Sequence, residues 1–302
     1  MNVRVLGAAA GGGFPQWNCR CTNCLRLRQG SLNGRSRTQA QLAVSADGKS
    51  WVLLNASPDL RAQIEATPEL WPASGVRHSP ISSIVLTSAE LDAVLGLLLL
   101  REFYPLQVYT TPSVRRILTE DNSMFAMLHR VEAQIRWHDL PASGSLVIDD
   151  LTFETLSEPS GFPGFVSQQR AATLNEAEAG VGVIVSDGDG ARLAFVPGCA
   201  DANAAILQRL ATCDTILFDG TFWSDDELIR VLGGAKRALE MGHLPIGGEQ
   251  GSLRKLASLT RQRKIYIHVN NTNPILDEDS SEFGEATRAG WKVAADGDSF
   301  LL

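Results

Sequence analysis

Short hydrophobic segments recur along the chain, and most of them are bounded by Gly, Asp or Ser. The early segments, at 3–6, 41–44 and 51–55, are rich in β-branched and apolar residues, which is typical of strands. The same pattern predicts later strands at 84–87, 107–110, 151–156, 181–186, 192–196, 215–218, 264–269 and 291–294.

Between several of these strands the pattern changes to that of helices. We expect a helix from about 90 to 103 and further helices at 203–211 and 252–261. Ser57-Pro58-Asp59 indicates a helix start, with Ser57 as N-cap and Pro58 at the first helical position. Near the N-terminus the predicted strands come in pairs that look antiparallel, and further along the chain they alternate with helices. This mixture predicts an α/β fold in which helices cover both faces of a two-sheet core.

Neither an internal repeat nor a charged linker interrupts the sequence, so we interpret residues 1–302 as a single domain. The formal net charge is −7, from 27 Lys plus Arg against 34 Asp plus Glu, and no basic cluster favours a nucleic-acid partner. The longest apolar run, 93–100, is too short to cross a bilayer. The strand at 2–6 carries Arg4 and leads into glycines, unlike a secretory signal. We therefore expect a cytoplasmic protein with neither nucleic-acid nor membrane partners.

Three of the five cysteines, Cys19, Cys21 and Cys24, lie within six residues. Thiolates at this spacing can converge on one tetrahedral Zn²⁺, with a fourth ligand from elsewhere in the chain. Asn271 or a more distant residue could supply that ligand, and three unrelated loop cysteines are the alternative. Because a closed, sulfur-rich site is structural, we expect this zinc to fasten the N-terminal loop or a subunit contact.

A glycine-rich segment, 8–15, directly follows the first strand. Such a turn can bind phosphate through backbone N–H groups or allow another segment to approach closely. The dinucleotide fingerprint requires a helix immediately after the glycines, whereas Phe14-Pro15 and the cysteines follow here. We therefore predict a tight structural loop.

Polar residues that could carry chemistry follow several predicted strands. Asp92 lies in the first turn of the helix predicted after 84–87, where it could bind a metal or substrate; Ser88 and Glu90 could equally be ordinary helix-start residues. Asp219 and His268 each end a hydrophobic strand, and His243 lies between glycines. A structural role and a functional role are about equally expected for these two histidines.

Several long motifs together make the chain resemble the family of pyrroloquinoline quinone biosynthesis protein B. They are the opening 6–19 with the rest of the cysteine cluster, and the segments 55–61, 96–102, 219–221, 241–244 and 268–276. The resemblance runs over essentially the whole chain.

The resemblance implies a metallo-β-lactamase-like αβ/βα sandwich, with two mixed sheets flanked by helices and a metal site at its mouth. It also implies a structural zinc on the 19–24 loop near a homodimer contact. The superfamily motif HxHxDH falls on Ser88, Glu90, Asp92 and Ala93. At Ala93 the chain departs from the family, in which Asp-His is expected, and this removes one metal ligand.

The activity that the resemblance implies is iron-dependent oxygenation, which hydroxylates the tyrosine-derived ring of the quinone precursor. A non-catalytic carrier of the quinone or its precursor is the alternative, and superfamily hydrolysis ranks third. A divalent ion, with Fe²⁺ favoured, would be held by Asp92, Asp219 and His268. His243 and Glu90 would act in catalysis, His243 as a further ligand or an acid/base group.

Two arginines are expected to bind the carboxylates of this substrate. Arg61 and Arg101 are chosen because a guanidinium group matches a carboxylate in bidentate geometry. Either could instead form a surface ion pair.

Overall fold

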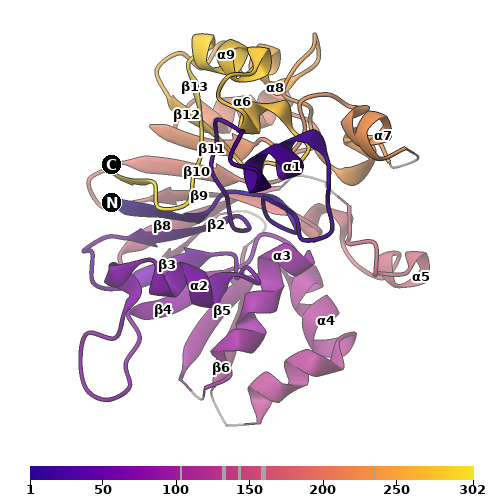
Figure 1. The fold of residues 1–302 in the computed structure, drawn as a ribbon. Coiled ribbons are helices and arrows are strands. Elements are labelled where there is room, and N and C mark those ends of the chain that lie inside the picture. Colours follow the sequence, from indigo (N-terminus) through magenta and orange to yellow (C-terminus); the bar gives the residue numbers. More distant parts are fainter. Residues whose placement is uncertain (103, 131–133, 142–143, 158–160, 234–235) are drawn as a thin grey trace.

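The computed structural model describes residues 1–302 except 103, 131–133, 142–143, 158–160 and 234–235. Within this part of the chain two seven-stranded sheets pack face to face (Figure 1). Neighbours in the first sheet follow the order β14 (Ser299–Leu301), β1 (Asn2–Gly7), β2 (Gln41–Ser45), β3 (Trp51–Leu54), β4 (Ile81–Val85), β5 (Leu106–Thr110) and β6 (Ile135–Asp139). Neighbours in the second follow the order β13 (Trp291–Val293), β12 (Arg263–Ile267), β11 (Thr215–Asp219), β10 (Arg192–Val196), β9 (Val181–Ser186), β8 (Leu151–Ser157) and β7 (Ser145–Ile148).

Each sheet is antiparallel in one half and parallel in the other. From β14 to β3 the first sheet is antiparallel, and β3 to β6 run parallel. From β7 to β10 the second sheet is antiparallel, and β10 to β13 run parallel. Since parallel strands need crossover connections, helices collect over the parallel halves.

Hydrophobic side chains of the central strands alternate between two buried layers. On β10, Leu193 and Phe195 lie in the core between the sheets. Ala194 and Val196 of the same strand pack on the outer face, under helices. Because both faces are buried, the central strands consist almost entirely of hydrophobic residues.

Helices cover the outer faces of both sheets, as predicted (Figure 1). Residues of α2, α3 and α4 pack on the first sheet, and residues of α6, α8 and α9 pack on the second. The helices of the described residues are α1 (Thr22–Arg28), α2 (Leu60–Glu65), α3 (Leu91–Val94), α4 (Pro112–Glu120), α5 (Gln168–Ala171), α6 (Ala204–Leu210), α7 (Glu227–Leu232), α8 (Ser252–Lys255) and α9 (Ser281–Arg288). Short 3-10 turns lie at Pro68–Leu70, Leu95–Leu100, Ser123–His129, Glu176–Glu178, Leu239–Met241 and Pro274–Leu276.

Every predicted strand is present, with ends shifted by up to three residues. Three observed strands were not predicted: β6, β7 and β14. All three are edge strands. Edge strands are short and carry polar side chains that face water, so their sequence lacks a continuous hydrophobic run.

The predicted helix from 90 to 103 is wrong in its extent. Its regular α-helical part is α3, and a 3-10 turn at Leu95–Leu100 follows, while residue 103 lies outside the described residues. The Gly96 N–H donates to the carbonyl of Ala56 (2.8 Å), and Ala56 donates to Ala93 (2.7 Å). These contacts with the preceding loop replace helical hydrogen bonds and interrupt the helix.

Two further helix predictions need correction at their ends. The helix predicted at 252–261 stops at Lys255, because the chain then turns irregularly to bury Leu256 and Leu259. The helix predicted from Ser57 begins at Leu60, and Ser57 Oγ accepts a hydrogen bond from the N–H of Asp59 (3.0 Å). The helix predicted at 203–211 is confirmed as α6, with the Asn203 side chain capping its N-terminus.

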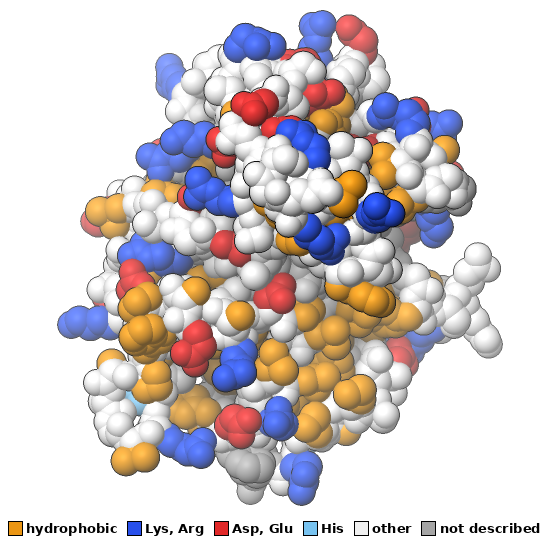
Figure 2. Space-filling view, in the orientation of Figure 1, with side chains coloured by type: hydrophobic (Ala, Val, Ile, Leu, Met, Phe, Trp, Pro, Cys, Tyr) orange, Lys and Arg blue, Asp and Glu red, His pale blue; other side chains and the backbone are white. Residues whose placement is uncertain are grey.

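The face drawn in Figure 2 carries Lys and Arg interspersed with Asp and Glu. Hydrophobic side chains gather over α3 and α4 on this face, and Leu91 and Leu99 are 51% and 40% exposed. Throughout the described ranges each helix is too short or too polar to span a bilayer.

We expect Leu217→Ala to lower the free energy of unfolding by about 3 kcal/mol, because it leaves a cavity in the core. Leu217 of β11 is fully buried between the two sheets. Urea denaturation of the purified variant would measure the loss. The control is Leu301→Ala on β14, where the side chain is 70% exposed and the change should stay within about 0.5 kcal/mol. Equal losses in both variants would contradict this assignment of the core.

Candidate functional site

The segment that follows β1 joins the two sheets at one edge. The Ala10 N–H donates to the carbonyl of Val269 (3.0 Å), and the Val269 N–H donates back to Ala8 (3.0 Å). On its other side Ala9 pairs with Gln39. Residues 8–10 therefore connect the first sheet to the residues that follow β12 in the second sheet.

The glycine-rich segment is a tight turn, as predicted. The Gly13 N–H donates to the carbonyl of Ala10 (3.0 Å), and Gly12 and Gly13 have φ angles of 93° and 70°. Positive φ favours glycine because other residues would place Cβ against the backbone. The turn brings Gly11 beside Asp92: a Cβ on Gly11 would lie 3.5 Å from Asp92 Oδ2.

Asp219, His243 and His268 converge at the same edge. Each offers one ligand atom, and these atoms all lie within 4.8 Å of one another. Asp219 ends β11 and His268 follows β12, and because these strands are neighbours and parallel, both residues emerge at the same edge. His243 comes from the loop after Gly242, whose left-handed conformation (φ 80°) ends a 3-10 turn.

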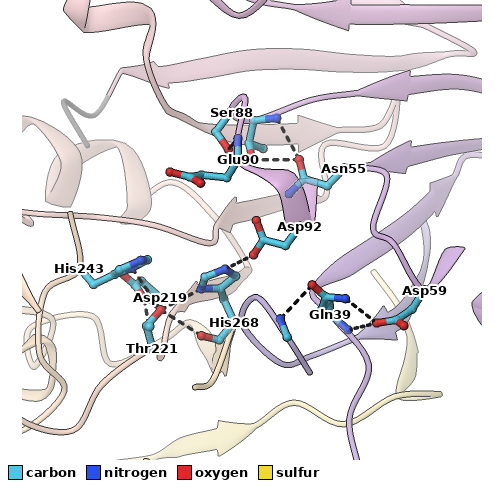
Figure 3. A network of polar contacts seen from close by, with 12 residues as sticks. Gln39, Asn55, Asp59, Ser88, Glu90, Asp92, Asp219, Thr221, His243 and His268 are labelled. Carbon is cyan, nitrogen blue, oxygen red and sulfur yellow. Dashed lines mark hydrogen bonds and ion pairs between the residues drawn. The ribbon is translucent and has the colours of Figure 1, made fainter. Parts of the chain in front are cut away.

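Asp92 approaches these residues from α3, which packs on the first sheet. Its Oδ2 lies 2.8 Å from Nε2 of His268 (Figure 3). The three predicted ligands Asp92, Asp219 and His268 are thus brought together, with Asp92 joined to the other two through His268. We call Asp92, Asp219, His243 and His268 the edge cluster.

Thr221 connects three members of the edge cluster, and it was not singled out from the sequence. Its hydroxyl donates to Asp219 Oδ1 (2.6 Å) and lies 2.8 Å from His268 Nδ1 and 3.1 Å from His243 Nδ1. The second oxygen of Asp219 accepts the N–H of Cys199 (3.0 Å) and lies 2.9 Å from His243 Nδ1. The Asp-Gly-Thr spacing is the signal that could have identified Thr221, because an Asp side chain often accepts the N–H two residues on, here at 3.0 Å.

These hydrogen bonds determine which nitrogen of His268 faces Asp92. A hydroxyl has one proton, and since Thr221 donates it to Asp219, Thr221 accepts from Nδ1–H of His268. Burial opposes charge on His268, but the hydrogen bond and charge of Asp92 raise the pKa of His268 above its ordinary value. Burial likewise opposes charge on Asp92, and His268 lowers the pKa of Asp92 below its ordinary value. The pair therefore holds a proton between Nε2 and Oδ2.

Glu90 lies at the N-cap of α3, close to the edge cluster (Figure 3). Desolvation and the charge of Asp92 raise the pKa of Glu90. The Glu90 N–H donates to Ser88 Oγ (3.2 Å), a contact typical of a helix start. Glu90 thus makes the contacts of an ordinary helix-start residue, and it also lies beside the edge cluster.

The two arginines predicted to bind substrate lie on the surface. Arg61 is exposed on α2, and Arg101 is exposed and lies 3.9 Å from the carboxylate of its neighbour Glu102. Across the described ranges no hydrogen bond or ion pair joins either guanidinium group to the edge cluster. Their role in substrate binding stays a prediction.

The three cysteines of the 19–24 loop also converge, and the side chain of Asn271 lies among them. Their sulfur atoms lie within 4.8 Å of one another. The Asn271 Nδ2 lies 3.1, 3.6 and 3.4 Å from Sγ of Cys19, Cys21 and Cys24. Because the two ends of an amide side chain exchange on rotation, Oδ1 reaches the same point. The side chain of Asn271, which was one of the two possible fourth ligands, therefore lies among the three sulfur atoms.

A family model described as the Beta-lactamase superfamily domain matches residues 50–269. Coenzyme PQQ synthesis protein B of Methylococcus capsulatus is 44% identical over 308 aligned positions that cover 100% of both chains. The protein of the same name from Methylorubrum extorquens is 42% identical over 299 positions that cover 98% of both. The chain belongs to the coenzyme PQQ synthesis protein B family.

A solved structure of this family has the same fold. The crystal structure of Zn²⁺-bound PqqB from Methylobacterium extorquens is 40% identical, covers 100% of both chains and superimposes with a TM-score of 0.93. The predicted family resemblance is therefore confirmed. The predicted metallo-β-lactamase-like αβ/βα sandwich is also confirmed.

Glu227, at the start of α7, is a buried carboxyl group behind the segment that carries His268 and Asn271. Its side chain accepts the N–H of Trp223 (2.7 Å) and the hydroxyl of Thr272. Only 3% of Glu227 is exposed, and burial raises its pKa to about 7. It stands in an acidic run, 225–227, which is typical of a surface, so the sequence did not distinguish it.

We expect Glu227→Gln to change how stability depends on pH. The folded-state pKa of about 7 exceeds the ordinary 4.5, so between these values the folded protein binds more protons than the unfolded protein. Wild-type stability therefore falls as pH rises through this window, by at most about 3 kcal/mol from this group. The variant lacks this loss. The unfolding free energy of the variant minus that of the wild type, measured by urea denaturation, should therefore increase from about pH 5 to about pH 8.

The matched control is Glu285→Gln on α9, where the glutamate is exposed. It should show no comparable increase, because its carboxylate stays in water. The same pH trend in both variants would show that Glu227 is not the group responsible.

Proposed function

We propose that the chain acts in the synthesis of coenzyme PQQ, as a metal-dependent oxygenase that hydroxylates the tyrosine-derived ring of the quinone precursor. The observation that carries this proposal is the convergence of the edge cluster where the two sheets meet. The names of the relatives, coenzyme PQQ synthesis protein B, support the pathway.

The donor set of the edge cluster fits one divalent ion. His268 Nε2 and Asp92 Oδ2 face one another at 2.8 Å, so both would hold one ion in place of the proton that they share. Asp219 is fully buried and contributes a second carboxylate. Imidazole nitrogen and carboxylate oxygen suit Fe²⁺, Mn²⁺ or Zn²⁺.

The small number of protein ligands favours oxygenation over hydrolysis. Ser88, Glu90 and Ala93 occupy the positions aligned with the superfamily histidines, and the side chain of Ala93 offers no ligand atom. An ion held by the edge cluster would keep positions open for oxygen and substrate, as at sites with two histidines and one carboxylate. Two tightly held zinc ions, which hydrolysis would use, are disfavoured. Fe²⁺ is the favoured ion because the reaction requires a redox-active metal.

Iron bound there would supply the electron transfer that activates O₂. One oxygen atom replaces a ring hydrogen as hydroxyl, and the other leaves as water, with two protons and two electrons from a reductant such as ascorbate. His243, which lies 2.9 Å from Asp219, and Glu90 at the N-cap of α3 would move protons.

For the 19–24 loop we propose a structural zinc held by Cys19, Cys21 and Cys24, with Asn271 as fourth ligand. The arrangement of three sulfur atoms around one amide group supports a closed tetrahedral site. We also propose a homodimer with this loop near the contact, which the 85% exposure of Trp17 supports.

We expect protein reconstituted with Fe²⁺ to consume O₂ when the tyrosine-containing precursor and ascorbate are present. Asp92→Ala should abolish this, because it removes a metal ligand. An oxygen electrode and mass spectrometry of the product, which gains 16 mass units per hydroxylation, would measure the reaction. Zinc-reconstituted protein is the matched control. Saturable precursor binding that survives Asp92→Ala, without any O₂ uptake, would instead establish the carrier function.

We expect Thr221→Val to weaken binding of the edge-cluster metal by about 10- to 100-fold, because the hydroxyl orients both histidines. Thr221→Ser, which keeps the hydroxyl, should restore affinity to within about threefold. Competition titration with a chromophoric chelator would measure both variants. Equal weakening in the two variants would show that the hydroxyl is not what matters.

A further inference from the structure

A cavity of about 350 Å³ lies between α7 and the loop 11–19. One wall is formed by Leu228 and Leu232, which are four residues apart and therefore on the same face of α7. The facing wall offers side-chain amide and hydroxyl groups, from Gln16, Asn18, Asn270 and Thr272. We call this space the α7 cavity.

The α7 cavity adjoins the edge cluster at two places. Gly11 lines the cavity, and the same residue packs beside the carboxylate of Asp92. Asn270, another lining residue, comes two residues after His268. A molecule bound against Gly11 would therefore lie one residue away from Asp92. Among the described residues, no member of the edge cluster itself lines the cavity, whereas Cys19 and Asn271 of the proposed zinc site do.

The lining selects an uncharged ligand with an apolar face and polar substituents. Of the described residues that line the cavity, none is Lys, Arg, Asp or Glu. A carboxylate would thus find no cation to pair with, in a chain whose net charge is −7. Leucine side chains pack against the face of a ring, while amide and hydroxyl groups bond to its hydroxyl substituents. A phenol ring combines these two properties.

We propose that the α7 cavity binds the phenol ring of the substrate and holds it beside the metal. This inference rests on the proposed function, since it names the part of the precursor that the site recognises. The cavity lies at the small end of the range for ligand pockets, which suits one ring rather than the whole precursor. The charged carboxylates of the precursor would then project outside it.

Hydrogen bonds hold the polar wall of the cavity in place. Thr272 donates its hydroxyl proton to Glu227 and accepts from Nδ2 of Asn270 (2.6 Å). Arg28 donates to the backbone carbonyls of Gln16 and Cys19 on the opposite loop. The amide groups are therefore positioned before a ligand binds, which lowers the entropy cost of binding.

The test uses p-cresol, a phenol with one methyl group and no charge at neutral pH, titrated against zinc-loaded full-length protein by saturation-transfer NMR. Leu228→Trp fills the cavity and should raise the Kd at least tenfold. Val231→Trp is the matched control, because Val231 lies on the same helix, is 44% exposed and does not line the cavity. Its Kd should equal that of wild type.

A second variant guards against misfolding of Leu228→Trp. Leu232→Gln changes a side chain that is 59% exposed, so the fold should tolerate it while the apolar wall is weakened. We expect a three- to tenfold rise in Kd with unchanged circular dichroism and zinc content. Wild-type affinity in both folded cavity variants would overturn the proposal.

The two measurements distinguish failure of the cavity proposal from failure of the oxygenase proposal. If p-cresol binding depends on Leu228 but iron-loaded protein consumes no O₂, the cavity proposal stands and the oxygenase proposal falls. If O₂ is consumed and the Kd for p-cresol is the same in wild type and in the cavity variants, the ring binds elsewhere and the cavity proposal falls.

Discussion

Hydrogen bonds between residues 8–10 and Val269 hold the two sheets together at the edge where the edge cluster lies. Asp92 comes from α3, which packs on the first sheet, whereas Asp219 ends β11 and His268 follows β12 in the second sheet. The contact between Asp92 and His268 therefore exists only if the sheets keep their relative position at this edge. The glycine-rich turn brings Gly11 into this contact region, where a Cβ on Gly11 would lie 3.5 Å from Asp92 Oδ2.

The segment 268–273 connects the edge cluster with three other parts of the molecule. Asn271 reaches the cysteine sulfurs, Thr272 reaches Glu227, and Asn273 donates to the carbonyl of Gly220 (2.9 Å). His268 itself has a left-handed backbone (φ 59°), which costs a residue other than glycine about 1 kcal/mol. The hydrogen bond from His268 Nδ1 to the Thr221 hydroxyl (2.8 Å) and that from the Val269 N–H to the carbonyl of Ala8 (3.0 Å) help to hold this conformation. Strain of this kind persists where surrounding contacts determine the backbone, and it is common at functional sites.

The central strands were predictable because burial on both faces requires continuous hydrophobic runs, as in 181–186. The edge strands were not, because half of their surface faces water and the run disappears, as in β6 with Arg136 and His138. The helix from 90 to 103 was overestimated because its hydrophobic pattern takes no account of the hydrogen bond between Gly96 and Ala56. The hydrophobic pattern of a segment therefore predicts its secondary structure where burial alone determines it. The prediction fails where a different segment of the chain supplies the hydrogen bonds.

The sequence by itself determined the donor types at the site, the close spacing of the three cysteines and the alanine beside Asp92. It also determined the family, because the motifs around these residues are long. Only the tertiary structure decided that His243 joins Asp219, that Thr221 contacts both histidines and that Asn271 lies among the sulfurs. The physical reason is distance along the chain: Asp92 and His268 are 176 residues apart, and Cys19 and Asn271 are 252 apart. Contacts between such positions depend on how two sheets pack, which no local pattern of residues specifies.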